Sequence, residues 1–252
     1  MIKAILFDLG GTLHTSDKPP GRDIWFAARL ISRLSDYGIR IEDSPKELAA
    51  YLDVSGEEYK HLSELFLREL PADQIWADHY LKKYGISREE ISICAEELSF
   101  LYDYERVRIM RRPHLKETFD ELREMGIRTG IISNIISRSV VPHFLAEYGI
   151  LDQMECIITS SGTGIRKPDP GIFRAAEDKL GLKPCELAYV GDTISRDIRG
   201  TRNAGWKLMI QISNPSIAFR DAGLEQSGYK ADRVITDLSE IPAILREENG
   251  LA

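Results

Sequence analysis

The residues of this chain that can do chemistry lie at the ends of short apolar runs. Asp8 ends the run IKAILFD and is followed by two glycines and a threonine in FDLGGTLH. The later candidates are Ser133 and Asn134 at the end of IRTGIISN, Lys167 in SSGTGIRKPDPGIF, and Asp192 and Asp197 in YVGDTISRD. Together these segments supply carboxylates, a hydroxyl and an ammonium group.

This set of side chains predicts a phosphoryl-transfer site. Two aspartates that face each other in a crevice repel, unless one is protonated or a divalent cation lies between them. Mg²⁺ suits such a site, because it binds one or two carboxylates together with a substrate phosphate oxygen. Lys167, the Ser133 hydroxyl and the backbone amides around Asn134 are then expected to bind the remaining phosphate oxygens.

The elements that must position these residues are strands of a parallel sheet. The apolar runs are short and unalternating, and from residue 113 onward they are separated by amphipathic helices, a pattern typical of a sheet that is covered on both faces. The carboxyl ends of such strands form one ligand-binding edge. We therefore predict an α/β fold with a doubly wound, Rossmann-like core made of residues 1–14 and 113–252.

Residues 15–112 are predicted to form an all-helical insertion between the two parts of the core. Ser44-Pro45-Lys46-Glu47 and Ser87-Arg88-Glu89-Glu90 have the form of capping boxes. No strand is predicted between residues 22 and 101. The arginines of RVRIMRRP (106–113) are interpreted as a solvated hinge, with recognition of an anionic substrate as the alternative.

Composition narrows the function classes. The formal net charge is -7 with a pI near 5.4, which argues against a nucleic-acid partner. Three cysteines lie far apart and form no Cys-x-x-Cys pair: Cys94, Cys156 and Cys185. This favours a reducing compartment over a disulfide framework or a zinc site. With no secretory signal or membrane span in the pattern, the prediction is a cytoplasmic protein that is not bound to a membrane, of unspecified oligomeric state.

The segments FDLGGTL, GIISN, SSGTGIRKPDPGIF and YVGDTISRDIRGTRNAG occur in the order of the four motifs of the haloacid dehalogenase-like hydrolases. The chain resembles the members of that family that carry a helical cap after the first motif. The resemblance implies that Asp8 is the nucleophile that forms an aspartyl-phosphate, and that Ser133, Asn134, Lys167 and Thr12 contact the phosphorylated substrate. It also implies a magnesium site.

The resemblance implies that the metal ligands of that site are Asp8, the Gly10 carbonyl and Asp192. It implies that Asp197 is either a further ligand or a side chain that contacts a ligand. The first motif of the family usually reads Asp-x-Asp-Gly-Thr, and its second aspartate is Gly10 here. Gly10 keeps the backbone carbonyl and lacks the carboxylate that acts as general acid and base. Such a group contributes about 10² to 10⁴-fold in rate.

The glycine leaves three outcomes open. The chain is a hydrolase for substrates with good leaving groups, or a cap residue or the substrate supplies the proton, or the site binds a phosphorylated ligand without turnover. The second outcome includes the phosphonate-cleaving relatives, which use a cap lysine. His14 is a further proton source, although a surface position is the default expectation for it. A dehalogenase is disfavoured, because the resemblance implies tyrosine at position 10 for that activity.

The leading hypothesis is a magnesium-dependent phosphatase for a small phosphorylated metabolite. The rival is a catalytically impaired phospho-ligand-binding or protein-interaction module on the same fold.

Overall fold

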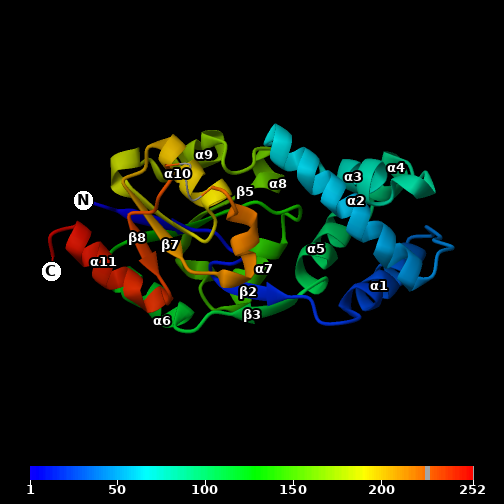
Figure 1. Cartoon of the computed structure of the whole chain (residues 1–252), viewed down its shortest axis with the longest axis horizontal. Coiled ribbons are helices and arrows are strands. Elements are labelled where there is room, and N and C mark those ends of the chain that lie inside the picture. The colour runs from blue at the N-terminus through cyan, green and yellow to red at the C-terminus, as the bar shows by residue number, and fades with distance from the viewer. Residues whose placement is uncertain (225–227, 252) are drawn as a thin grey trace.

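The core is built on a sheet of six parallel strands, which confirms the predicted fold class. The computed structural model describes residues 1–224 and 228–251. The strands stand in the order β5-β4-β1-β6-β7-β8, and the sheet lies in the half of the molecule that holds both termini (Figure 1). Their bounds are β1 Ala4–Phe7, β4 Arg128–Ser133, β5 Met154–Thr159, β6 Leu187–Gly191, β7 Leu208–Ile212 and β8 Arg233–Ile235. The strand order reverses at β1, and ligands are expected at the carboxyl ends of the strands around such a switch point.

Helices cover both faces of this sheet. One face packs against α6 (Leu115–Glu124), α7 (Val140–Glu147) and α11 (Ile241–Glu248), and the other against α9 (Pro170–Leu180) and α10 (Arg199–Ala204). Strand β1 is buried on both faces: Ile5 and Phe7 belong to the first cluster, and Ala4 and Leu6 to the second. This two-sided burial explains why β1 reads as an apolar run without alternation.

Shorter elements connect these units. They are α8 Ser160–Thr163, η3 Leu151–Gln153, η4 Pro184–Glu186, the π-helix η5 Ile194–Ile198, η6 Pro215–Asp221 and η7 Leu238–Glu240. Among the described residues, no helix is both long and apolar enough to cross a membrane.

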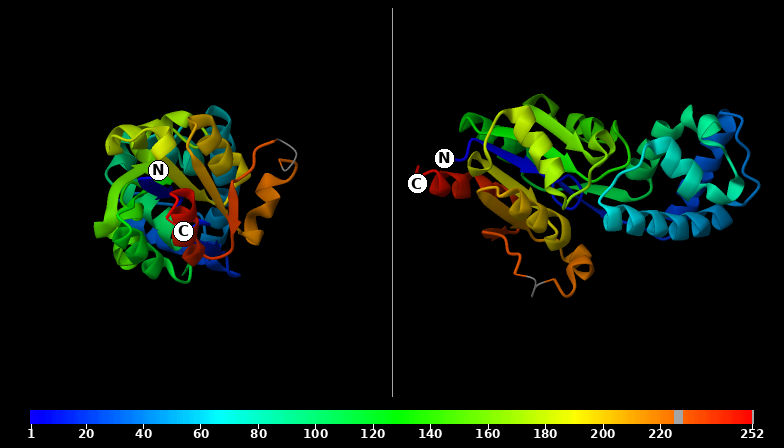
Figure 2. Two further views of the ribbon diagram at one scale, coloured as in Figure 1. Left: turned by 90° about the vertical axis from the view of Figure 1, so that its left-hand side faces the viewer. Right: turned by 90° about the horizontal axis from the view of Figure 1, so that it is seen from above.

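The residues between the first strand and α6 form a helical cap that projects from one end of the core (Figure 2). Its helices are α1 Arg22–Asp36, α2 Pro45–Phe66, α3 Ala72–Ile75, the π-helix η1 Trp76–Tyr80, η2 Lys82–Tyr84, α4 Arg88–Ser92 and α5 Ala95–Glu105. They enclose a hydrophobic core of their own, centred on the fully buried Trp76. Both predicted capping boxes are present, at the start of α2 and of α4.

The cap is joined to the core by a two-stranded antiparallel ribbon, β2 (His14–Asp17) with β3 (Arg108–Arg111). Residues 108–111 of the predicted solvated hinge thus form a strand, in which Arg108 and Arg111 are exposed. Arg112, which directly follows β3, donates to the carbonyls of Gly11 at 2.7 Å and Ser213 at 3.0 Å. The exact division into residues 1–14, 15–112 and 113–252 stays a prediction.

Beyond the ribbon, the end of α2 is tied to the core. The backbone of residues 67–69 pairs with that of residues 164–166. The fully buried carboxylate of Glu69 forms an ion pair with the Arg166 guanidinium and accepts a hydrogen bond from the Ser160 hydroxyl at 2.6 Å. A cap carboxylate is therefore embedded in the core loop that leads to the predicted lysine.

A second carboxylate of the cap domain accepts hydrogen bonds from a core loop. Glu96, on α5, accepts hydrogen bonds through Oε1 from the Ser137 hydroxyl at 2.7 Å and from the amides of Arg138 and Ser139 at 2.9 and 3.1 Å. These donors precede α7 and follow the predicted phosphate-binding residues of β4. The cap thus contacts both loops that are expected to hold phosphate.

Candidate active site

Asp8, Lys167 and Asp197 converge at the carboxyl ends of β1 and β6. The Lys167 ammonium lies 3.0 Å from Asp8 Oδ1 and 2.7 Å from Asp197 Oδ1, and it donates to the Tyr189 hydroxyl at 2.8 Å. All of these side chains are buried. Lys167 therefore bridges two acids that lie far apart in the sequence.

Both carboxylate oxygens of Asp197 have protein partners. Its Oδ1 binds Lys167, while Oδ2 accepts hydrogen bonds from the Thr193 amide at 3.0 Å and hydroxyl at 2.6 Å. Asp197 lies on the π-helix η5 directly after β6. These contacts fit the prediction that Asp197 is the partner of a ligand better than the prediction that it is a ligand itself.

Asp192 presents a free oxygen to the same cluster. Its Oδ2 accepts a hydrogen bond from the Asn214 side chain at 2.8 Å, whereas its buried Oδ1 has no partner within the described part of the chain. Asp8, Asp192 and Asp197 each offer an oxygen within 4.8 Å of the others. A buried carboxylate oxygen without a donor is costly. A hard divalent cation at this position satisfies it, so the donor set fits Mg²⁺.

Gly11 is required by the position of Asp192. Gly11 has a φ of +86°, and a Cβ on it would lie 1.7 Å from Asp192 Oδ2. Gly10 differs, because the nearest atom to a Cβ there would be His14 Nε2 at 4.0 Å. The second glycine of the motif makes room for the acid, while the first leaves an open space beside Asp8.

The electrostatics of the cluster follow from burial and from Lys167. Burial raises the pKa of Asp8, and Lys167 opposes this. Burial, with repulsion from Asp197 and Asp8, raises the pKa of Asp192 to about 7. Burial also disfavours charge on Asp197, but Lys167 and Arg196 outweigh it and lower its pKa. Lys167 and Arg196 neutralise only part of the negative charge that the three aspartates carry when they are ionised, as expected of a site that binds a cation.

The predicted substrate-binding residues divide into two groups. Ser133 and Asn134 line a cavity of about 240 Å³ together with Asp8, Gly10 and Asp192. The Asn134 side chain is also bonded to the Lys167 backbone, since it accepts from the amide at 2.8 Å and donates to the carbonyl at 3.0 Å. Asn134 thus fixes the loop that carries the lysine.

Thr12 belongs to the other group. It is fully buried and does not line the cavity, and its Oγ1 has no hydrogen-bond partner among the described residues. The structure therefore does not bring Thr12 to the substrate site. Lys167 lies in the loop before α9, and Asp169 caps that helix.

His14 is also buried, at 5% exposure, in contrast to the expected surface position. Its Nδ1 is 2.8 Å from the Tyr148 hydroxyl, and burial lowers its pKa to about 4.

Sequence reasoning missed two further charged residues of the cavity wall, Asp103 and Arg196. Arg196 directly precedes Asp197 in the fourth motif, a position that was visible in the sequence, whereas Asp103 lies in the cap with no motif around it.

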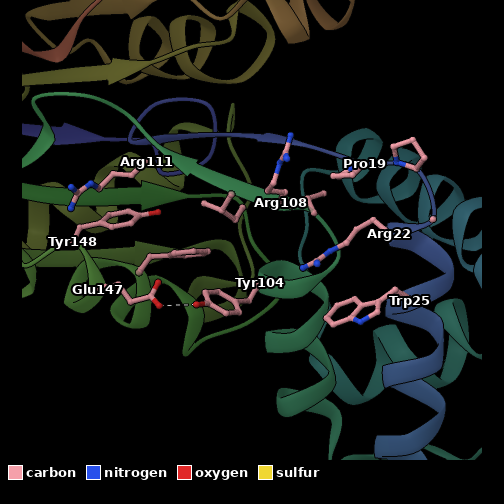
Figure 3. Close-up of a pocket in the computed structure, with 13 residues that line it drawn as sticks. Pro19, Arg22, Trp25, Tyr104, Arg108, Arg111, Glu147 and Tyr148 are labelled. Atoms are coloured by element: carbon pink, nitrogen blue, oxygen red, sulfur yellow. Dashed lines mark hydrogen bonds between the residues drawn. The ribbon is translucent and has the colours of Figure 1, made fainter.

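A wider cavity of about 570 Å³ adjoins the first between the cap and α7 (Figure 3). The two share Val107, Ile109 and Phe144 in their walls. The charged and aromatic residues of the wider cavity include Arg22, Trp25, Tyr104, Arg108, Arg111, Glu147 and Tyr148. It provides a polar, partly aromatic space beside the buried acids.

A family model of haloacid dehalogenase-like hydrolases matches residues 2–205. The chain belongs to the haloacid dehalogenase-like hydrolases. This confirms the resemblance drawn from the four motifs. Hydrolases of this family generally use Mg²⁺, in agreement with the donor set around Asp192.

Among curated proteins, the chain is similar to the glyceraldehyde 3-phosphate phosphatase of Pyrococcus furiosus, with 32% identity over 255 residues, 99% of this chain and 95% of the relative. The enzyme of the same name from Methanopyrus kandleri is 28% identical over 213 residues, 81% of this chain and 82% of the relative. Among solved structures, a HAD phosphatase from Thermococcus onnurineus has a TM-score of 0.59 at 25% identity, covering 97% of this chain and 98% of that one.

Proposed function

We propose that this hydrolase is a magnesium-dependent phosphatase that acts on a small phosphorylated metabolite through an aspartyl-phosphate on Asp8. Its similarity to phosphatases over nearly the full chain supports the phosphorylated substrate. The observation that carries the proposal is the buried cluster in which Asp8 contacts Lys167, while none of residues 1–224 and 228–251 donates to Asp192 Oδ1.

In this proposal Asp8 attacks phosphorus, and the bond to the leaving oxygen breaks. Lys167 counters the charge on Asp8 and on the transferring phosphoryl group, while Asp197 and Tyr189 keep the ammonium in place. Ser133 and the amides that follow it bind the phosphoryl oxygens. Asp8, Asp192 and the Gly10 carbonyl would hold Mg²⁺, which supplies charge neutralisation when bound.

The wider cavity provides room for the part of the substrate that leaves. It adjoins the site of attack through Val107, Ile109 and Phe144, so a leaving group of a few carbon atoms extends toward Arg111. Arginine pairs well with anionic and polar groups. This arrangement favours a compact polar alcohol over a macromolecular substrate.

The test compares the native protein with Asp8→Asn on para-nitrophenyl phosphate and acetyl phosphate in the presence of Mg²⁺. Native turnover that is lost with Asp8→Asn, and kept with Asp169→Asn at the cap of α9, is the expected result. Because both substrates have good leaving groups, they need little protonation. A native protein that binds phosphate and hydrolyses neither substrate would instead be the phospho-ligand-binding module.

A further inference from the structure

The missing carboxylate at position 10 leaves the leaving group without a proton donor from the first motif. The space beside Gly10 is open, and two titratable side chains outside the acidic cluster line the same cavity, His14 and Asp103. An alkyl alkoxide is a poor leaving group and needs a proton as the bond to phosphorus breaks. One of these two side chains is therefore the natural donor.

We propose that Asp103, a residue of the cap, is the general acid that protonates the leaving oxygen. This inference rests on the proposed phosphatase function. Asp103 lies near the end of α5 and reaches the cavity wall that also carries Asp8 and Gly10. The proposal assigns to the cap the role that the first motif has lost.

The position of Asp103 is fixed by the loop that follows β4. Its Oδ2 accepts a hydrogen bond from the Ser137 amide at 2.9 Å, three residues after Asn134. One oxygen is thus held by the core, and the carboxyl group stays at the cavity when the cap is docked as in this structure. A donor positioned by a backbone amide needs no reorganisation at the moment of reaction.

The surroundings of Asp103 keep part of it protonated at neutral pH. Burial raises its pKa to about 7, the Ser137 amide opposes this, and the nearby Glu69 and Arg106 act in opposite directions. About half of the Asp103 carboxyl groups then carry a proton at pH 7, against about one in a thousand for an ordinary aspartate. His14, with a pKa of about 4, is protonated in only about one molecule in a thousand.

The step balances without an added reagent. As Asp8 bonds to phosphorus, the bond between phosphorus and the leaving oxygen breaks, and that oxygen takes the proton of Asp103 to leave as an alcohol. Asp103 is now a carboxylate. It accepts a proton from the water that attacks the aspartyl-phosphate, so Asp8 is released as a carboxylate, phosphate leaves, and Asp103 is protonated again.

The experiment measures kcat/KM of the native protein and Asp103→Asn on two substrates. The alkyl probe is glyceraldehyde 3-phosphate, and the aryl probe is para-nitrophenyl phosphate. Loss of a general acid should lower turnover of the alkyl probe by about 10² to 10⁴-fold, and that of the aryl probe by less than about threefold. A merely structural role would lower both alike, and this equal loss would overturn the proposal.

Two further variants sharpen the test. Glu96→Gln changes the other cap carboxylate that contacts the Ser137 loop but lies outside the cavity, so it should leave the ratio of the two rates unchanged. Adding Gly10→Asp to Asp103→Asn should restore alkyl turnover, because a Cβ at Gly10 would lie 4.0 Å from the nearest described side-chain atom, His14 Nε2, and the added carboxylate replaces the missing acid. A double variant that gains nothing would count against a proton-transfer role.

A readout independent of turnover is the infrared band of the protonated carboxyl group. Asp192 is expected to give such a band near pH 7 in both proteins, so the readout is the difference between the spectra of the native protein and Asp103→Asn. This difference should contain a further band that titrates near pH 7, and two identical spectra would reject the assignment. If the native protein turns over neither probe, the proposed phosphatase function itself fails. If Asp103→Asn keeps full alkyl turnover, only the assignment of the acid fails.

Discussion

Replacing Gly11 by alanine should disable the acidic cluster, whereas the same replacement at Gly10 should leave it intact. A Cβ on Gly11 would lie 1.7 Å from Asp192 Oδ2 and 2.9 Å from Asn214 Nδ2, so both side chains must move. Among the described residues, the nearest contact of a Cβ on Gly10 would be His14 Nε2 at 4.0 Å. The two glycines are adjacent, which makes Gly10→Ala a matched control.

The expected loss of stability follows from the backbone conformation of Gly11. At a φ of +86°, alanine costs about 1–2 kcal/mol from steric crowding alone. For a chain of this size each kcal/mol shifts Tm by about 2–4 °C, so Gly11→Ala should lower Tm by about 2–8 °C. Gly10→Ala should stay within about 0.5 kcal/mol of the native protein.

Magnesium separates the site effect from the strain. At a concentration of about 100 times Kd, a ligand that binds only the folded state stabilises it by about 2.7 kcal/mol, or about 5–11 °C here. Scanning calorimetry with and without Mg²⁺ should show this gain for the native protein and Gly10→Ala, and not for Gly11→Ala. A Gly11→Ala protein with the full gain would refute the placement of the ion at Asp192.

Three other changes test contacts around the site. Glu69→Ala should cost about 3–5 kcal/mol in denaturant unfolding, because Arg166 is left buried without its partner, and a smaller loss with methionine at both positions is the control. Asn134→Ala should lower kcat more than it raises KM, since it frees the Lys167 backbone; an unchanged kcat would contradict this role. Arg111→Ala should raise KM for an alkyl phosphate with little change in kcat, and an unaffected KM would remove Arg111 from substrate binding.

The parallel core was predictable because its strands are buried on both faces and therefore written as continuous apolar runs. The same reasoning located Asp8, Ser133 and Asp192, since each follows such a run directly. Strand β8 has only three residues, RVI, and the ribbon strands HTSD and RIMR are polar and short. Their pairing depends on partners distant in sequence, which no local pattern records.

Side-chain surroundings were less predictable than positions. His14 follows the first motif with no apolar pattern of its own, yet it is buried against Phe144 and Tyr148 through contacts that form only when α7 packs beside β2. Asp103 has no sequence signature, because its role in the cavity wall depends on how the cap docks. Acids delivered by another domain are visible only in three dimensions.

The ion pair between Glu69 of the cap and Arg166 of the core limits which caps this core can accept. A cap from a relative without an acid at this position would leave the Arg166 guanidinium buried and unpaired, one residue before Lys167. Caps and cores of this lineage are therefore expected to change together, and chimeras are expected to require paired substitutions at the seam. Substrate range in this chain is more readily altered at Arg22, Trp25 and Arg111, which line the wider cavity, whereas Glu69 and Arg166 do not.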